Sequence, residues 1–136
     1  ENSKQFVPID WDEVTYQIKK LPTAKEVYVA RGEAEGISLE VEYDGIEEDA
    51  DIFSIIISLS EKKFEEKYKS ACKAALMIDE WGLSEEELQT FSTEPYFTFD
   101  SSAVQQFSSE TAGTLYVIFG EYTCLIYTEK AWELRD

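Results

Sequence analysis

The side chains with the greatest capacity for chemistry in this sequence are carboxylates, and their spacing is uneven. Ten Asp or Glu residues and no Lys or Arg occur from Gly32 to Glu61. Ten more acidic residues occur from Ala74 to Glu129, again without a basic residue, whereas five lysines lie together between positions 62 and 73. Clustered carboxylates can coordinate a divalent cation, form an acid–base pair, or attract a positively charged protein.

The densest acidic run, Glu47-Glu48-Asp49-Ala50-Asp51, does not have the pattern of a dedicated cation site. A calcium-binding loop of the EF-hand type needs alternating acidic residues followed by glycine, with a glutamate at its twelfth position. Here the glycine of Asp44-Gly45 comes before the acids instead of after them. The sequence therefore predicts no metal site and no cofactor.

Enzymatic chemistry has little support in the residue types. The chain contains no histidine, which removes the base of Ser-His-Asp and Cys-His systems. The segment from Gly32 to Gly36 has two glutamates and no following lysine, so it cannot hold a phosphate as a glycine-rich loop does. With 29 acidic residues, some carboxylate pair is close by chance. We therefore expect a protein that is not an enzyme.

The overall charge narrows the class of partner. Twelve basic and 29 acidic residues give the 136-residue chain a formal net charge of −17. Such a chain is repelled by nucleic-acid phosphate and by anionic membrane surfaces, and no apolar run approaches the roughly 20 residues of a spanning helix. Repulsion among so many negative charges works against the compact state, so we expect the electric field that they create to serve a function. The partner that this field would attract is a basic protein.

The two cysteines, Cys72 and Cys124, lie in apolar surroundings without a CxxC or zinc-type spacing. Buried free thiols are typical of a reducing compartment, so the sequence predicts a cytoplasmic protein.

The first half of the chain predicts one helix and three strands. Asp10 and Glu13 have the spacing of a capping box, which favours a helix over 11–20 that ends before Pro22. A short strand over 26–31 and an alternating strand over 37–43 follow, joined by the glycine-bounded loop 32–36. The β-branched run 52–59 is apolar on both faces and reads as a central strand.

Helices dominate the next segment. Apolar residues recur at three- and four-residue steps over 61–81, which predicts a long helix with Ser60 as its N-cap and Gly82 just beyond its end. Ser84 and Glu87 form a second capping box and open a short helix that reaches about Phe91.

The last third returns to strands. Residues 96–99 predict a short aromatic strand, and 103–107 are compatible with a strand or a loop. Residues 114–119 and 122–128 predict a hairpin whose turn is Gly120-Glu121, with Val117 opposite Cys124. The whole pattern predicts a single α+β domain over 1–136: a mainly antiparallel sheet of five to six strands, with one long and two short helices packed on one face.

We expect the partner to bind around the second predicted strand and the loop that follows it, where acids and one aromatic residue lie together. The predicted partner-binding residues are Glu40, Glu42, Tyr43, Asp44, Glu47, Glu48, Asp49 and Asp51, with Tyr43 as the aromatic anchor.

In being small, acidic, α+β and without catalytic residues, the chain resembles the immunity proteins of bacterial toxin systems and other acidic nuclease inhibitors. This resemblance in overall type implies an inhibitor, an immunity protein or antitoxin, that occludes the active site of a basic nuclease toxin by presenting carboxylates where the substrate presents phosphates. The alternative is a non-catalytic accessory or regulatory module of a larger assembly, which would use an apolar sheet edge or helix face instead.

Overall fold

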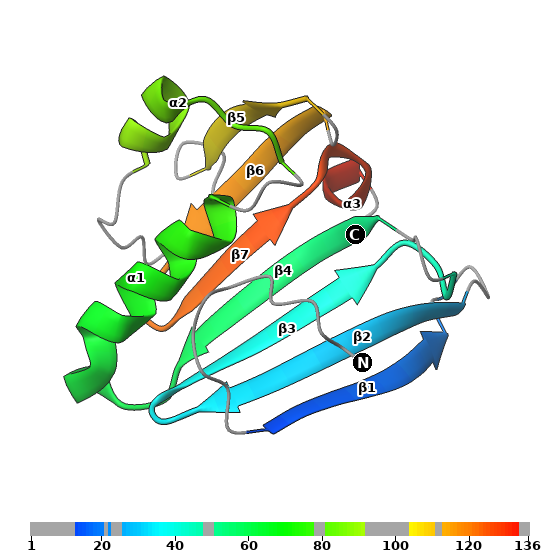
Figure 1. Ribbon diagram of the computed structural model, residues 1–136, viewed down its shortest axis with the longest axis horizontal. Helices are drawn as coiled ribbons and strands as arrows, with labels where there is room; N and C mark the ends of the chain where they lie inside the picture. The colour runs from blue at the N-terminus through cyan, green and yellow to red at the C-terminus, as the bar shows by residue number, and fades with distance from the viewer. Residues whose placement is uncertain are drawn as a thin grey trace.

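The computed structural model describes residues 13–20, 22, 26–47, 51–77, 81–91, 104–110 and 113–133. Within these residues, seven strands form one antiparallel sheet in the order β1-β2-β3-β4-β7-β6-β5 (Figure 1). Their bounds are β1 Glu13–Lys20, β2 Glu26–Ala34, β3 Ile37–Tyr43, β4 Ile52–Leu59, β5 Gln105–Ser109, β6 Gly113–Phe119 and β7 Thr123–Tyr127. The predicted α+β class is confirmed, and the sheet has more strands than the five to six expected.

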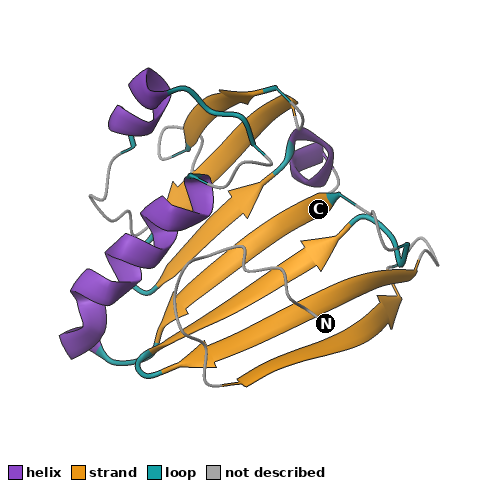
Figure 2. Cartoon of the chain, viewed as in Figure 1, coloured by secondary structure: helices purple, strands orange, loops and turns teal. Residues whose placement is uncertain are grey.

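The helical elements are short apart from one. A 3-10 turn over Lys62–Phe64 leads into α1 (Glu65–Leu76), and α2 (Glu85–Gln89) and α3 (Glu129–Glu133) have five residues each. Helix α1 lies across one end of the sheet (Figure 2), with Tyr68, Cys72 and Leu76 among its buried residues. Leu88 and Phe91, in and just after α2, pack against the same core. We call the side of the sheet that carries this core the helical face.

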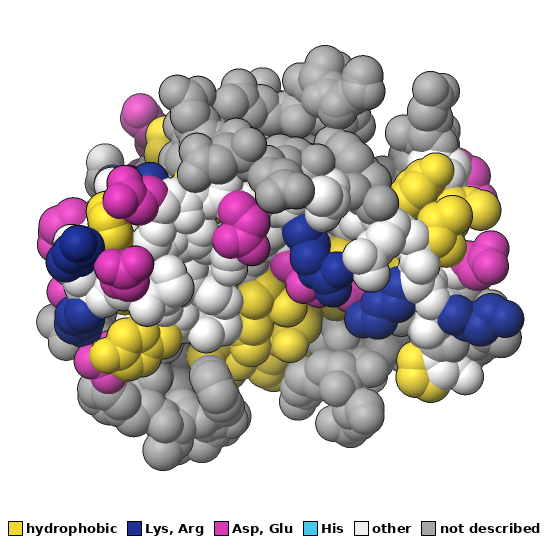
Figure 3. Space-filling model, turned by 90° about the horizontal axis from the view of Figure 1, so that it is seen from below, with side chains coloured by type: hydrophobic (Ala, Val, Ile, Leu, Met, Phe, Trp, Pro, Cys, Tyr) yellow, Lys and Arg dark blue, Asp and Glu magenta, His cyan; other side chains and the backbone are white. Residues whose placement is uncertain are grey.

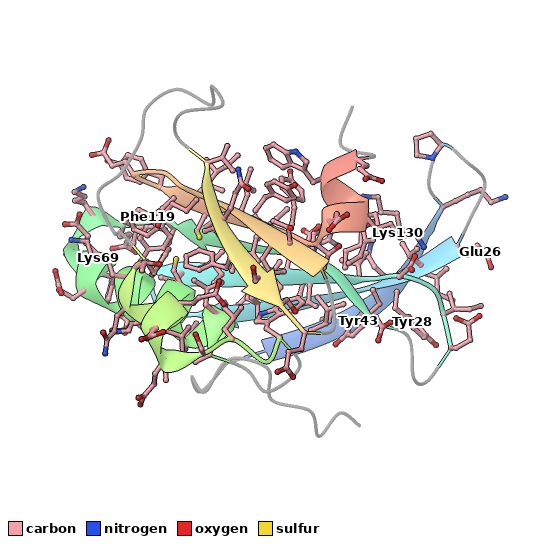
Figure 4. All side chains as sticks on the ribbon, turned by 90° about the horizontal axis from the view of Figure 1, so that it is seen from above. Glu26, Tyr28, Tyr43, Lys69, Phe119 and Lys130 are labelled. Atoms are coloured by element: carbon pink, nitrogen blue, oxygen red, sulfur yellow. The ribbon has the colours of Figure 1, made fainter. Side chains whose placement is uncertain are left out.

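Alternation along the strands defines a second face. Leu115 and Val117 of β6 and Cys124 and Ile126 of β7 belong to the core on the helical face, so Tyr116 and Tyr127 point to the opposite side. Trp132 of α3 stacks on Tyr116 there. Helix α3 therefore packs on the second face, across the sheet from α2 (Figure 4). The expectation that every helix shares one face is wrong for this helix.

The helix predicted over 11–20 is wrong for its described part, because residues 13–20 form strand β1. All eight residues pair with β2, from Glu13 opposite Glu33 to Lys20 opposite Glu26. The apolar residues Val14, Tyr16 and Ile18 recur every second position, which is the period of a strand. The capping-box spacing was the misleading signal, since a local cap is worth about 1 kcal/mol and eight paired residues outweigh it.

The long helix is shorter at both ends than predicted. Ser60 caps nothing, because the 3-10 turn begins after Glu61 and α1 begins after Phe64 without a side-chain cap. At its other end, the indole of the buried Trp81 donates a hydrogen bond to the Ala75 carbonyl at 2.8 Å. Trp81 therefore packs against the end of α1. Gly82 has a positive φ of 64° but lies well past the helix end.

Smaller differences concern turns. Strand β2 runs through Gly32 to Ala34, so the first hairpin turns at Glu35-Gly36, where Gly36 has φ of 83°. In the last hairpin the Gly120 amide donates to the Thr123 carbonyl at 2.8 Å, which places the turn at Glu121-Tyr122. Val117 therefore faces Ile126 instead of Cys124.

Other predictions have mixed outcomes. The cap of α2 is confirmed, since the Ser84 hydroxyl accepts from the Glu87 amide. Strand β4 has the predicted bounds, and the ambiguous segment 103–107 contributes to β5. The strand predicted over 96–99 lies outside the described residues.

Candidate partner-binding face

Strand β3 divides the predicted site between the two faces of the sheet. Val41 and Leu39 belong to the core on the helical face, so Glu40 and Glu42 lie on the second face. Tyr43 follows an irregularity in the β3–β4 register and packs against the core. Figure 4 shows Tyr43 beside Tyr28, across the sheet from Lys130. Tyr43 is therefore on the opposite side of the sheet from the carboxylates that it was expected to accompany.

Cations from other strands and from α3 accompany the acids of β3. Arg31 Nε lies 3.0 Å from Glu40 Oε1, and Lys130 Nζ lies 2.8 Å from Asp44 Oδ2. Lys19 Nζ lies 4.0 Å from Glu42 Oε1. Seen from the β1 side, acidic and basic side chains alternate over the surface instead of forming a continuous acidic coat (Figure 3). The negative charge of the stretch from Gly32 to Glu61, which contains no Lys or Arg, is thus partly neutralised by cations from other parts of the chain.

The surroundings of Glu42 shift the pKa of its carboxyl. Partial burial raises the pKa of Glu42 above its ordinary value, and the nearby Glu40 charge adds to the rise, while Lys19 opposes both. Only 13% of its side chain is exposed, compared with 46% for Lys19. A half-buried carboxylate with a distant cation is costly to keep charged, and such groups are frequent at functional sites.

The loop after β3 is held at its base, and two of its acidic residues, Glu47 and Asp51, are exposed. The Asp44 amide donates to the Asp51 carbonyl at 2.8 Å, and the Tyr28 amide donates to the Gly45 carbonyl at 3.1 Å. Glu47 and Asp51 are exposed and form no ion pair within the described part of the chain. Glu48 and Asp49 lie outside the described residues. The loop base is therefore rigidly joined to β2 and α3, and the carboxylates next to it remain available.

An aromatic cluster lies on the same face as Glu40 and Glu42. The rings of Trp132 and Tyr116 stack with centroids 4.5 Å apart and planes 9° apart, and Tyr127 contacts the same indole at 6.0 Å. Glu42, Ser54, Tyr127 and Tyr116 stand opposite one another on four adjacent strands. At about 4.8 Å per strand, the Glu42 and Tyr127 backbones are roughly 10 Å apart. All three aromatic side chains are partly exposed.

The cluster was not predicted from the sequence, although the sequence contains two indications of it. Trp132 lies after the last strand, away from any apolar pattern, and Tyr116 and Tyr127 alternate with core residues. Two other aromatic residues near acids have different positions: Trp81 is buried in the core, and Tyr122 is an exposed turn residue beneath Lys62.

The cysteines and the potential metal ligands were the other groups considered from the sequence. Cys72 and Cys124 are free, buried thiols, and burial raises the pKa of Cys72 well above its ordinary value, which makes it unreactive. No group of three potential metal ligands occurs in the portion that the structure describes. In that portion no helix has the length and apolar character to cross a membrane.

Comparison with known proteins gives no relative for this chain. No protein-family model, no curated protein and no solved structure matches it.

Proposed function

We propose that this chain is a non-enzymatic inhibitor of a basic protein, an immunity protein or antitoxin that neutralises a nuclease toxin by covering its active site. The observation that carries the proposal is the juxtaposition on the second face of the sheet: Glu42 lies in register with Tyr127 and Tyr116, on which Trp132 stacks, and Glu40 lies on the same face. Carboxylates can occupy the positions of substrate phosphates, while Trp and Tyr residues contribute most of the binding energy in protein interfaces.

The charge of Glu42 supports a binding role for this face. Its carboxylate is partly buried, burial raises its pKa, and the nearest cation is 4.0 Å away. A charge held in this way opposes folding. It can gain a closer cation when a basic partner closes over it, and an ion pair formed there is screened less than one on the open surface.

The β3–β4 loop supports fast association. Its base is fixed by the Asp44–Lys130 ion pair and by two backbone hydrogen bonds, while Glu47 and Asp51 are exposed. Exposed charges of one sign accelerate encounter with an oppositely charged partner and add less to the affinity of the final complex. We therefore assign steering to the loop and affinity to the face that carries Glu42 and Trp132.

The experiment begins with affinity capture from the native host, followed by purification of the captured protein and an assay of its nuclease activity. Inhibition of that activity at a one-to-one ratio is the expected result. Two variants then separate the two roles. Glu47→Lys with Asp51→Lys should slow association at low salt, and Trp132→Ala should accelerate dissociation by roughly 30-fold, as for an interface hot spot.

A matched control makes the same change in net charge at a position away from the proposed face. Glu85 and Glu86 are exposed acids in the first turn of α2, where the helix dipole accounts for them. Glu85→Lys with Glu86→Lys changes the net charge by the same amount as the loop variant. If this pair slows association as much as the loop pair does, net charge alone drives binding and the proposed face is wrong.

The accessory-module alternative is favoured by one observation, the outer edge of β1, with which no strand in the described residues pairs. Binding through a strand edge uses main-chain hydrogen bonds, which salt screens weakly. A steep loss of affinity between about 50 and 500 mM salt would support the inhibitor, because the Debye length falls severalfold over that range.

A further inference from the structure

The two cysteines of the chain lie next to each other in the core, although they are far apart in the sequence. Cys72 is on α1 and Cys124 is on β7, and both are 0% exposed. The Cys72 thiol is in hydrogen-bonding contact with the Cys124 thiol and with the Tyr68 hydroxyl. Both cysteines are free. The core therefore holds a reduced pair of thiols where α1 meets β7.

Contacts of other residues fix the same placement independently. The Tyr68 hydroxyl donates to the Gly120 carbonyl at 2.7 Å, and the Tyr68 ring stacks on Phe119 with centroids 5.2 Å apart. Phe119 stands opposite Cys124 in the β6–β7 register. Cys72 lies one helical turn after Tyr68 on the buried side of α1. The helix thus brings Cys72 to the part of β7 that contains Cys124.

Small residues let α1 approach the sheet closely at this point. Ala71 and Ala75, which lie before and after Cys72 on the helix, are 0% exposed and belong to the same core cluster as both cysteines. Two cysteines can be bridged without backbone movement only if their Cα atoms lie within about 7 Å and their side chains point toward each other. Contact between the two thiols meets the second condition, and alanines at the interface favour the first.

We infer that Cys72 and Cys124 form an intramolecular disulfide when the chain meets a disulfide oxidant, and that this bond joins α1 covalently to β7. With oxidised glutathione, the thiolate of one cysteine attacks a glutathione sulfur, breaks its S–S bond and releases one glutathione thiolate. The thiolate of the other cysteine then attacks the protein sulfur of this mixed disulfide and releases the second glutathione thiolate. Each cysteine loses one proton, and the two electrons reduce one glutathione disulfide to two thiols. This property does not depend on the proposed inhibitor role.

Burial controls the rate of this reaction. The thiolate is the attacking species, and burial raises the pKa of Cys72 well above its ordinary value. Neither sulfur is accessible to an oxidant while α1 is packed on the sheet. The disulfide therefore forms during folding, before α1 docks, or through local opening of α1 in the folded chain. Once formed, it is protected from reductants by the same burial.

A bond at this position also stabilises the fold. It closes the loop that runs from Cys72 on α1 to Cys124 on β7, and a closed loop of this length removes much of the conformational freedom of the unfolded chain. The gain is realised only if the native core accommodates the bond, because a strained disulfide lowers stability instead. The change in Tm on oxidation therefore separates a native pair from two cysteines that meet only in the unfolded chain.

The test unfolds the reduced full chain in urea and refolds it at low protein concentration in a mixture of oxidised and reduced glutathione. Intact mass should show a single chain that has lost two hydrogens and carries no glutathione. Its Tm should exceed that of the reduced chain by roughly 6–15 °C, and dithiothreitol added to the unfolded chain before refolding should abolish the rise. Oxidation of the folded chain without urea should give the same product roughly tenfold more slowly or less.

Cys72→Ala and Cys124→Ala are the matched controls, because each variant keeps one thiol and cannot close the bond. Each is compared with itself under dithiothreitol, so that its own loss of stability cancels, and neither should show the mass loss or the rise in Tm. A wild-type chain that refolds with both thiols free overturns the proposal. So does a disulfide that leaves the Tm unchanged or lowers it, or one that forms only between two copies of the chain.

Discussion

The hydroxyl of Tyr68 offers a sharp test of how the last hairpin is held. Tyr68 is 1% exposed, and its hydroxyl donates a hydrogen bond to the Gly120 carbonyl at 2.7 Å. Its ring also stacks on Phe119 at 5.2 Å. Tyr68→Phe keeps the ring and removes only the donor, which leaves a buried carbonyl next to the hairpin turn without this bond.

The expected loss follows from the burial of that carbonyl. A buried hydrogen-bonding group without its partner costs about 1–3 kcal/mol. Since the ring packing is retained, we expect Tyr68→Phe to lower the free energy of unfolding by about 1–2 kcal/mol. For a chain of 136 residues this corresponds to a fall in Tm of about 4–7 °C.

Urea unfolding followed by circular dichroism measures this directly, with a lower midpoint and an unchanged slope as the expected result. Tyr122→Phe is the matched control, because Tyr122 is 48% exposed in the adjacent turn and should change stability by less than about 0.5 kcal/mol. If Tyr68→Phe is as stable as Tyr122→Phe, the bond to Gly120 contributes little to the stability of the hairpin and the reasoning is refuted.

Two further predictions concern single positions. Burial raises the pKa of Glu42, so its charge opposes folding at neutral pH, and this effect disappears below about pH 4, where the unfolded-state carboxyl is also protonated. Glu42→Gln should therefore be more stable than the wild type at pH 7 and equal to it near pH 3 in urea titrations; a constant difference across pH would contradict this. Gly36→Ala should lose more than about 2 kcal/mol in the same assay, because Gly36 has a positive φ and a Cβ there would overlap the Phe64 ring. An alanine variant as stable as the wild type would show that the turn adopts another conformation.

The local residue pattern was sufficient to predict the elements whose apolar side chains repeat with a clear period or whose first turn has a clear capping residue. The run 52–59 became β4 with its predicted bounds, and Ser84 caps α2 as its spacing indicated. Both features depend on residues within one strand or one turn. Strand β1 was misassigned because its capping-box signal was local, whereas its pairing with β2 depends on residues up to 20 positions away.

The candidate site could be predicted only in part, for a similar reason. Spacing along the chain located Glu40, Glu42 and Asp44, but it could not show that Arg31 and Lys130 lie beside two of them. The alternation over 37–43 did place Tyr43 on the opposite side of the strand from Glu42, and Tyr43 packs against the core as that alternation predicts.

The sequence by itself determined the α+β class, the excess of negative charge and the absence of histidine chemistry, because these follow from composition and short-range periodicity. The tertiary structure alone decided which charges remain uncompensated and which aromatic residues accompany them. Trp132 reaches Tyr116 because β6 and β7 pair and α3 folds back over them. Lys130 reaches Asp44 across 86 residues of chain. Contacts between distant segments depend on strand order and register, which the spacing of residues along the chain does not specify.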